Sequence, residues 1–141
     1  METTQVREYL KEIKFMRQYL ERLKKRRSAL HLEVSFGGID YSADRIVNSP
    51  KNKLEEAMIK LSDRLEKIDS QIVKLTLEID ERIGNIESLN NNNEKMILYM
   101  CYVEDKTLQD ISDELEYSYN YVCGIHGEGL IHLGEIITEC E

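Results

Sequence analysis

Two cysteines and two histidines near the carboxyl end are the side chains best suited to bind a metal or act in catalysis. They are Cys123, His126, His132 and Cys140. A structural zinc site usually takes two closely spaced ligand pairs, whereas only Cys123 and His126 form such a pair here. A catalytic cysteine and histidine would also need a third residue to orient the histidine, and none is indicated. We therefore expect no metal, no cofactor, no small-molecule substrate and no enzymatic activity.

The same segment carries polar side chains that suit contacts with DNA. Ser118 and Tyr119 can bond phosphate, and Asn120 can make a bidentate contact with adenine. His126 is interpreted as either partly buried or facing phosphate. The candidate DNA-binding residues are Lys106, Thr107, Ser118, Tyr119, Asn120, Cys123, Gly124, His126 and Gly127.

Three short helices must position these residues. Asn93 is expected to cap a helix over 94–103, and Thr107 a helix from Leu108 to Leu115. Glu116 and Tyr117 make a tight turn, in which Glu116 occupies the position that favours glycine because its φ is positive. Ser118 caps the helix that follows. The pattern predicts a helix-turn-helix, with a helical hairpin that only packs as the alternative.

Two longer helices precede this unit. Apolar residues alternate at spacings of four and three from Tyr9 to Leu30 and again from Leu54 to Leu89, which is the heptad pattern of a coiled coil. Gly37-Gly38 and Pro50 indicate a long connection over about 34–52. The narrow seam of the second helix must be covered by the first helix, by a second chain, or by both. The predicted fold is all-α, with a helical hairpin or coiled coil over 1–89 and a trihelical unit over 90–141.

Charge is distributed unevenly along the chain. Residues 1–30 hold nine basic residues and four acids, whereas no Lys or Arg follows Lys106 and eight acids do. Affinity for DNA depends largely on Lys and Arg, so an acidic helix-turn-helix binds DNA weakly by itself. Dimerisation through the second helix would raise the affinity. The cluster Lys24, Lys25, Arg26 and Arg27 either contacts phosphate or forms a solvated helix face.

Composition narrows the location. The amino terminus lacks the apolar stretch of a signal peptide, and no apolar run approaches the roughly 18 residues of a membrane span. We expect a cytosolic protein whose three cysteines are free thiols.

Residues 96–133 resemble region 4 of sigma-70 factors, and most closely the phage-encoded late-transcription regulators of the RinA/ArpU type. The motifs that carry the resemblance are Cys101-Tyr102-Val103, Ile111-Ser112, Leu115-Glu116-Tyr117 and Ile125-His126-Gly127-Glu128-Gly129-Leu130. The chain departs from the family pattern in that Cys101 replaces the usual Arg, Glu116 replaces Gly and Gly124 replaces a common basic residue. Beyond Leu130, where the family often has Lys, the chain has Ile131 and His132.

The resemblance implies a phage or prophage transcription regulator that binds promoter DNA as a homodimer and contacts RNA polymerase. A second hypothesis comes from the acidic composition. In that hypothesis the chain is a coiled-coil interaction protein whose helix-turn-helix no longer binds DNA and contacts only other proteins.

Overall fold

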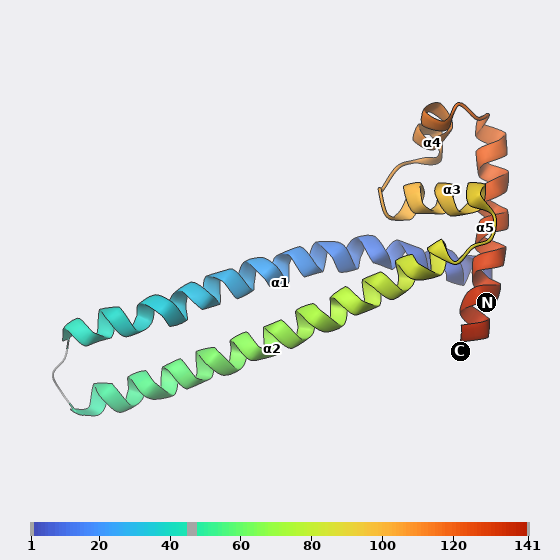
Figure 1. Ribbon diagram of the computed structural model, residues 1–141. Coiled ribbons are helices and arrows are strands. Elements are labelled where there is room, and N and C mark those ends of the chain that lie inside the picture. The colour runs from blue at the N-terminus through green and yellow to red at the C-terminus, as the bar shows by residue number, and fades with distance from the viewer. Residues whose placement is uncertain (1, 45–47, 141) are drawn as a thin grey trace. The chain divides into compact units, whose positions relative to one another are not determined.

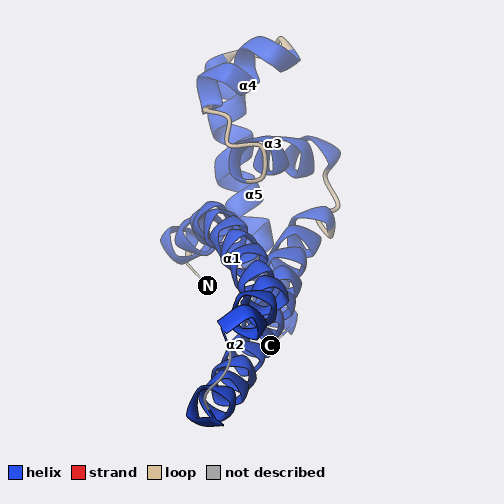
Figure 2. Cartoon of the chain, turned by 90° about the vertical axis from the view of Figure 1, so that its left-hand side faces the viewer, coloured by secondary structure: helices blue, strands red, loops and turns tan. Residues whose placement is uncertain are grey.

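The computed structural model describes the backbone of residues 2–44 and 48–140 and the side chains of 2–33 and 52–140. This part of the chain is helical and contains no strand (Figure 2). None of its helices offers an apolar stretch of bilayer-spanning length. The helices are α1 (Thr3–Asp44), α2 (Asn48–Glu87), α3 (Asn92–Tyr102), α4 (Leu108–Leu115) and α5 (Tyr119–Cys140) (Figure 1). The predicted all-α class is confirmed.

The long connection predicted over 34–52 is wrong, because α1 continues to Asp44 and α2 already begins at Asn48. Glycine weakens a helix by only about 1 kcal/mol relative to alanine, so Gly37 and Gly38 do not end α1. Pro50 lies in the first turn of α2, where a backbone N–H has no partner inside the helix and its loss is tolerated.

The compact unit Tyr19–Thr76 contains the second half of α1 and the first half of α2, which lie side by side (Figures 1 and 2). Leu20, Leu23 and Leu30 are buried along α1, and Ile68 is buried on α2. Arg27 interrupts this apolar series, and its guanidinium forms an ion pair with Asp69 of α2. The ion pair explains how the helix seam accommodates a charged residue.

The other compact unit joins residues 1–18 to residues 77–141. In this unit the start of α1 packs along the end of α2. Arg82 links the two helices, since its guanidinium donates to the carbonyl of Tyr9 at 2.7 Å and lies 4.3 Å from the centre of the Tyr9 ring. Within each unit, therefore, α1 covers the apolar seam of α2, as expected for a helix folded back. Pairing with a second chain stays a prediction.

Helices α3, α4 and α5 form the predicted trihelical unit around Ile97, Met100, Ile111 and Val122. Asn91, rather than the predicted Asn93, caps α3, and its side chain accepts hydrogen bonds from the backbone N–H groups of Asn93 and Glu94. Any of the four consecutive asparagines suits a cap, so propensity alone could not choose between them. The predicted division of the chain between 89 and 90 falls in the turn between α2 and α3 and stays a prediction.

Candidate nucleic-acid interface

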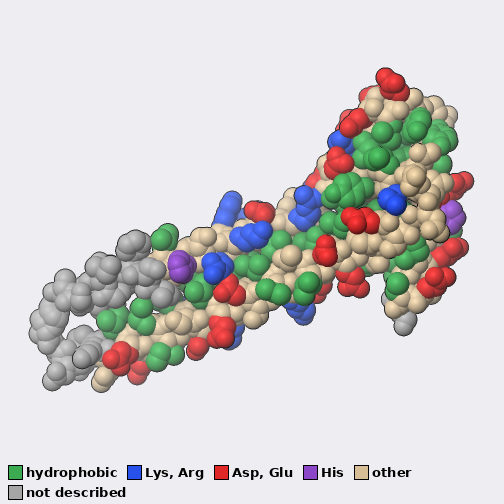
Figure 3. Space-filling view, in the orientation of Figure 1, with side chains coloured by type: hydrophobic (Ala, Val, Ile, Leu, Met, Phe, Trp, Pro, Cys, Tyr) green, Lys and Arg blue, Asp and Glu red, His purple; other side chains and the backbone are tan. Residues whose placement is uncertain are grey.

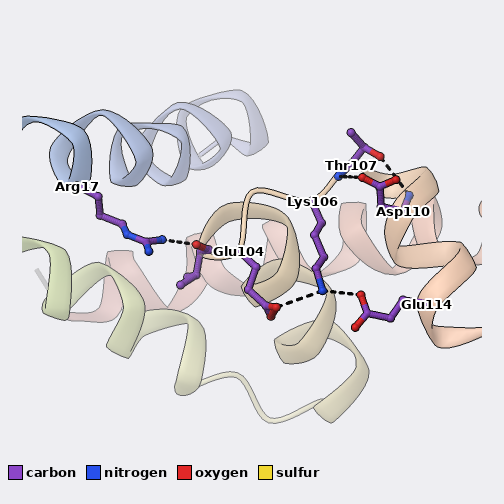
Figure 4. Close-up of polar contacts among 7 residues, drawn as sticks. Arg17, Glu104, Lys106, Thr107, Asp110 and Glu114 are labelled. Atoms are coloured by element: carbon purple, nitrogen blue, oxygen red, sulfur yellow. Dashed lines mark hydrogen bonds and ion pairs between the residues drawn. The ribbon is translucent and has the colours of Figure 1, made fainter.

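Helix α4 begins at a capping box. The Thr107 hydroxyl accepts a hydrogen bond from the backbone N–H of Asp110 at 3.1 Å, and the Asp110 carboxylate accepts one from the N–H of Thr107 at 3.3 Å (Figure 4). These bonds satisfy two backbone donors that the helix cannot satisfy itself. The predicted cap and the predicted bounds of α4 are confirmed. The oxygen of the Thr107 hydroxyl accepts in this cap, as that of Ser118 does at α5, and its O–H remains able to donate.

A left-handed residue makes the turn between α4 and α5. Glu116 has φ 59° and ψ 35°, the conformation expected for its position. The hydroxyl of Ser112 donates to the carbonyl of Tyr117 at 2.7 Å, which holds the far side of the turn. Ser118 then accepts a hydrogen bond from the N–H of Tyr121 at 3.2 Å and caps α5 as predicted. The helix-turn-helix is thus fixed by local bonds at both of its helix starts.

The first two turns of α5 present most of the predicted DNA-binding residues. Ser118, Tyr119, Asn120 and Gly124 are exposed. Cys123 is half-buried, and its interaction with Tyr119 raises the pKa of that phenol. Gly127 is half-buried, and a Cβ atom added at Gly124 or Gly127 would meet no other atom within 4 Å. This surface of α5 is therefore open, and its two glycines would let another backbone approach closely.

His126 does not share this surface. Its side chain is buried, and Nε2 lies 2.8 Å from the hydroxyl of Tyr102 on α3, with the two rings stacked. Burial, and then the nearby charge of Arg7, lowers the pKa of His126. Of the two interpretations of His126, the structure supports the buried one, so it is removed from the candidates for phosphate contact.

Lys106 is the last basic residue of the chain, and two carboxylates surround it. Its ammonium group lies 3.2 Å from Glu104 and also bonds Glu114, which is the main cause of its raised pKa (Figure 4). These acids offset the charge that Lys106 would offer to a phosphate. The helix-turn-helix gains little cationic character from this residue.

The four basic residues of the predicted cluster at 24–27 do not share one helix face, and their contact with phosphate stays a prediction. Successive residues of a helix are rotated by about 100°, so four in a row point in different directions. Lys24 pairs with Glu21 at 3.8 Å and Arg27 pairs with Asp69, while Lys25 is exposed. Arg26 lines a hollow of the unit Tyr19–Thr76, together with Arg64 and Lys67 of α2.

Two histidine contacts were not predicted from the sequence. Besides the bond between Tyr102 and His126, Nδ1 of His132 donates to the carboxylate of Glu94 at 2.7 Å. The Glu94 side chain is only 2% exposed, so this contact lies at the edge of the core. Within the described residues, no three His, Cys, Asp or Glu side chains are placed to hold a metal ion.

Fold and site together define an all-α protein with a helix-turn-helix unit. The second helix of that unit, α5, is exposed to solvent near its start. A family model matches residues 40–124, and the chain belongs to this family, DUF1492, described as a protein of unknown function. Neither the curated proteins nor the solved structures contain a match to the chain.

Proposed function

We propose that this protein is a transcription regulator that binds promoter DNA through the first two turns of α5. The observation that carries the proposal is the open surface of Ser118, Asn120 and Gly124 directly after the fixed turn at Glu116. In helix-turn-helix proteins this part of the second helix enters the major groove. A turn held by capping bonds positions that helix with little loss of conformational entropy on binding.

Each exposed residue has a role in this proposal. Asn120 donates to and accepts from the edge of an adenine, a contact that discriminates between base pairs. Ser118 and Tyr119 bond phosphate at the positive end of the helix dipole. Gly124 and Gly127 leave room for the groove wall, since neither carries a side chain. His126 contributes indirectly by fixing α5 against α3.

The family resemblance supports a more specific role, in which the protein acts at a phage or prophage late-gene promoter and contacts RNA polymerase. A dimer would present two copies of α5 to adjacent turns of the duplex and raise the apparent affinity. The acidic surface of α4, with Asp113 and Glu114 exposed, suits contact with a basic surface of the polymerase.

A second candidate function is protein binding without DNA. Tyr117, Tyr119 and Tyr121 are between 40% and 47% exposed at the start of α5, and tyrosine is enriched in protein interfaces. Tyr117 and Tyr121 already pack edge to face, with ring centres 5.1 Å apart. Because the segment after Lys106 holds eight acids and no Lys or Arg, these rings would suit a partner rich in Arg and Lys.

Selection from a pool of random-sequence duplexes separates the two candidates. The regulator enriches a sequence motif, and Asn120→Ala weakens binding to the enriched duplex by about 1–3 kcal/mol while leaving binding to random duplex unchanged. Asn52→Ala, at an exposed asparagine of α2, is the matched control and keeps the selectivity. Absence of any enriched motif at low salt would rule out sequence-specific DNA binding and leave protein binding as the candidate function.

A further inference from the structure

The two compact units carry opposite charge. The unit Tyr19–Thr76 contains twelve basic residues and nine acids, whereas the unit with the helix-turn-helix contains seven basic residues and eighteen acids. On the face drawn in Figure 3, carboxylates gather over α4 and α5, while Lys and Arg gather along α1. The surplus of positive charge therefore lies on the paired helices of the unit Tyr19–Thr76, away in sequence from the residues expected to read bases.

Three basic side chains meet in one hollow of this unit. Arg26 of α1 and Arg64 and Lys67 of α2 line a space of about 440 Å³, whose remaining described lining is Tyr19, Leu23, Ile68 and Gln71. None of these lining residues is acidic, and all three basic residues are exposed. The lining thus carries two guanidinium groups and one ammonium group from two helices, a composition that suits an anion.

A lysine row extends the hollow along α2. Lys53, Lys60, Lys67 and Lys74 recur at every seventh residue and are all exposed. Seven residues make nearly two helical turns, so the four lysines lie on one face of α2, over a length of about 31 Å. Arg64 lies one turn before Lys67 on the same face. We call the row and the hollow together the cationic groove.

We propose that the cationic groove binds the phosphate backbone of duplex DNA and supplies the affinity that the acidic helix-turn-helix lacks. The identity of the duplex as a promoter rests on the proposed function, but phosphate binding by the groove does not. Guanidinium groups bind phosphate through two parallel hydrogen bonds, and regularly spaced lysines neutralise successive phosphates. The helix-turn-helix then selects the sequence and the groove provides most of the binding energy.

Carboxylates of a second copy are the competing occupant, because the helix-turn-helix unit carries a large surplus of acids. A backbone phosphate carries one negative charge, as a carboxylate does, but duplex DNA repeats that charge about every 1.7 Å along its axis and can therefore occupy the whole lysine row. The two occupants also predict different effects when the groove is mutated. Loss of the groove would reduce DNA binding in one case and the mass of the assembly in the other.

The test compares two double variants of the full chain, binding a fluorescent random-sequence duplex over a range of salt concentrations. Arg64→Gln/Lys67→Gln removes two charges from the groove. Lys11→Gln/Lys14→Gln removes two exposed charges of α1 at positions outside the groove and outside the predicted cluster at residues 24–27. Light scattering gives the mass of each protein, and circular dichroism confirms that each remains helical.

The groove variant is expected to bind the random duplex roughly tenfold more weakly, with a salt slope about 2 lower, while the control retains wild-type binding. Equal loss in both variants, or no loss in either, would overturn the proposal. A change of mass without loss of DNA binding would overturn it in favour of a contact between copies. If random-duplex binding depends on the groove but the selection enriches no sequence, sequence-specific binding by the helix-turn-helix would be rejected and phosphate binding by the groove would stand. Wild-type protein that binds no duplex at low salt would overturn both.

Discussion

The hydroxyl of Tyr102 lies 2.8 Å from Nε2 of His126, inside the core where α3 packs against α5. Burial raises the pKa of Tyr102 to about 12, so the phenol keeps its proton at neutral pH and forms a neutral hydrogen bond with the imidazole, whose direction is set by the histidine tautomer. The bond connects α3 to α5, the helix proposed to contact the DNA bases. It therefore holds α5 at a fixed rotation relative to α3.

Tyr102→Phe should lower the free energy of unfolding by about 1–3 kcal/mol, because it leaves a buried ring nitrogen of His126 without its hydrogen-bond partner. Tyr99→Phe is the matched control, since Tyr99 lies on the same helix and is less buried. Urea unfolding followed by circular dichroism measures both. Equal stability of the two variants would mean that the Tyr102–His126 bond contributes nothing specific.

The buried His126 also predicts sensitivity to acid. Its pKa is lowered in the folded state by burial, whereas in the unfolded chain it titrates at about 6.5. The stabilising effect of neutral His126 is complete above about pH 6.5 and is lost as the pH falls from that value toward the folded pKa, because only the unfolded chain binds the proton. His126→Gln should thus show a smaller loss of stability between about pH 7.5 and 5.5 than wild type. His31→Gln, at an exposed histidine, should lose as much as wild type; the same loss in both variants would refute the assignment.

Glycines in α5 should respond oppositely to alanine. A Cβ atom at Gly129 would lie 3.1 Å from Cδ1 of Leu98, a side chain that is fully buried in the core. Gly129→Ala should lower the free energy of unfolding by about 1 kcal/mol, since overpacking exceeds the gain in helix propensity. Gly124→Ala meets no atom within 4 Å and should raise it by about 0.5–1 kcal/mol. Thermal melts of the pair check this, and stabilisation by both would show that α3 and α5 are not closely packed at Gly129.

The left-handed conformation of Glu116 predicts a stabilising substitution. Glu116→Gly should raise the free energy of unfolding by about 0.5–1 kcal/mol, because glycine adopts positive φ without a steric penalty. Glu128→Gly makes the same chemical change at an exposed position inside α5 and should cost about 1 kcal/mol. Urea titrations would report the difference. A loss of stability at both sites would contradict the conformation assigned to the turn.

Features encoded by adjacent residues were predicted well from the sequence. The cap at Thr107, the bounds of α4 and the left-handed turn at Glu116 depend on side chains that bond their own backbone neighbours. Such interactions are properties of a short segment and can be recognised there. The break between the two long helices was placed less well, because Gly37-Gly38 weakens a helix without ending it.

Contacts between distant residues could not be predicted in the same way. His126 and Tyr102 are 24 positions apart, and nothing in either local pattern selects the other as a partner. Arg26 lines the same hollow as Arg64 and Lys67 because of the register of α1 against α2, and this register is set by packing. One signal was available, since the spacing of Lys53, Lys60, Lys67 and Lys74 is visible in the sequence and places a charged row on one face of α2.

The central claim is that this acidic chain binds duplex DNA through charges located outside its helix-turn-helix. Its most direct test is the salt dependence of wild-type binding to a fluorescent duplex, measured by anisotropy from about 50 to about 200 mM salt. We predict saturable binding whose affinity falls linearly on logarithmic axes, with a slope that Arg64→Gln/Lys67→Gln reduces by about 2. The absence of saturable binding at the lowest salt concentration, or a slope that this variant leaves unchanged, would contradict the claim.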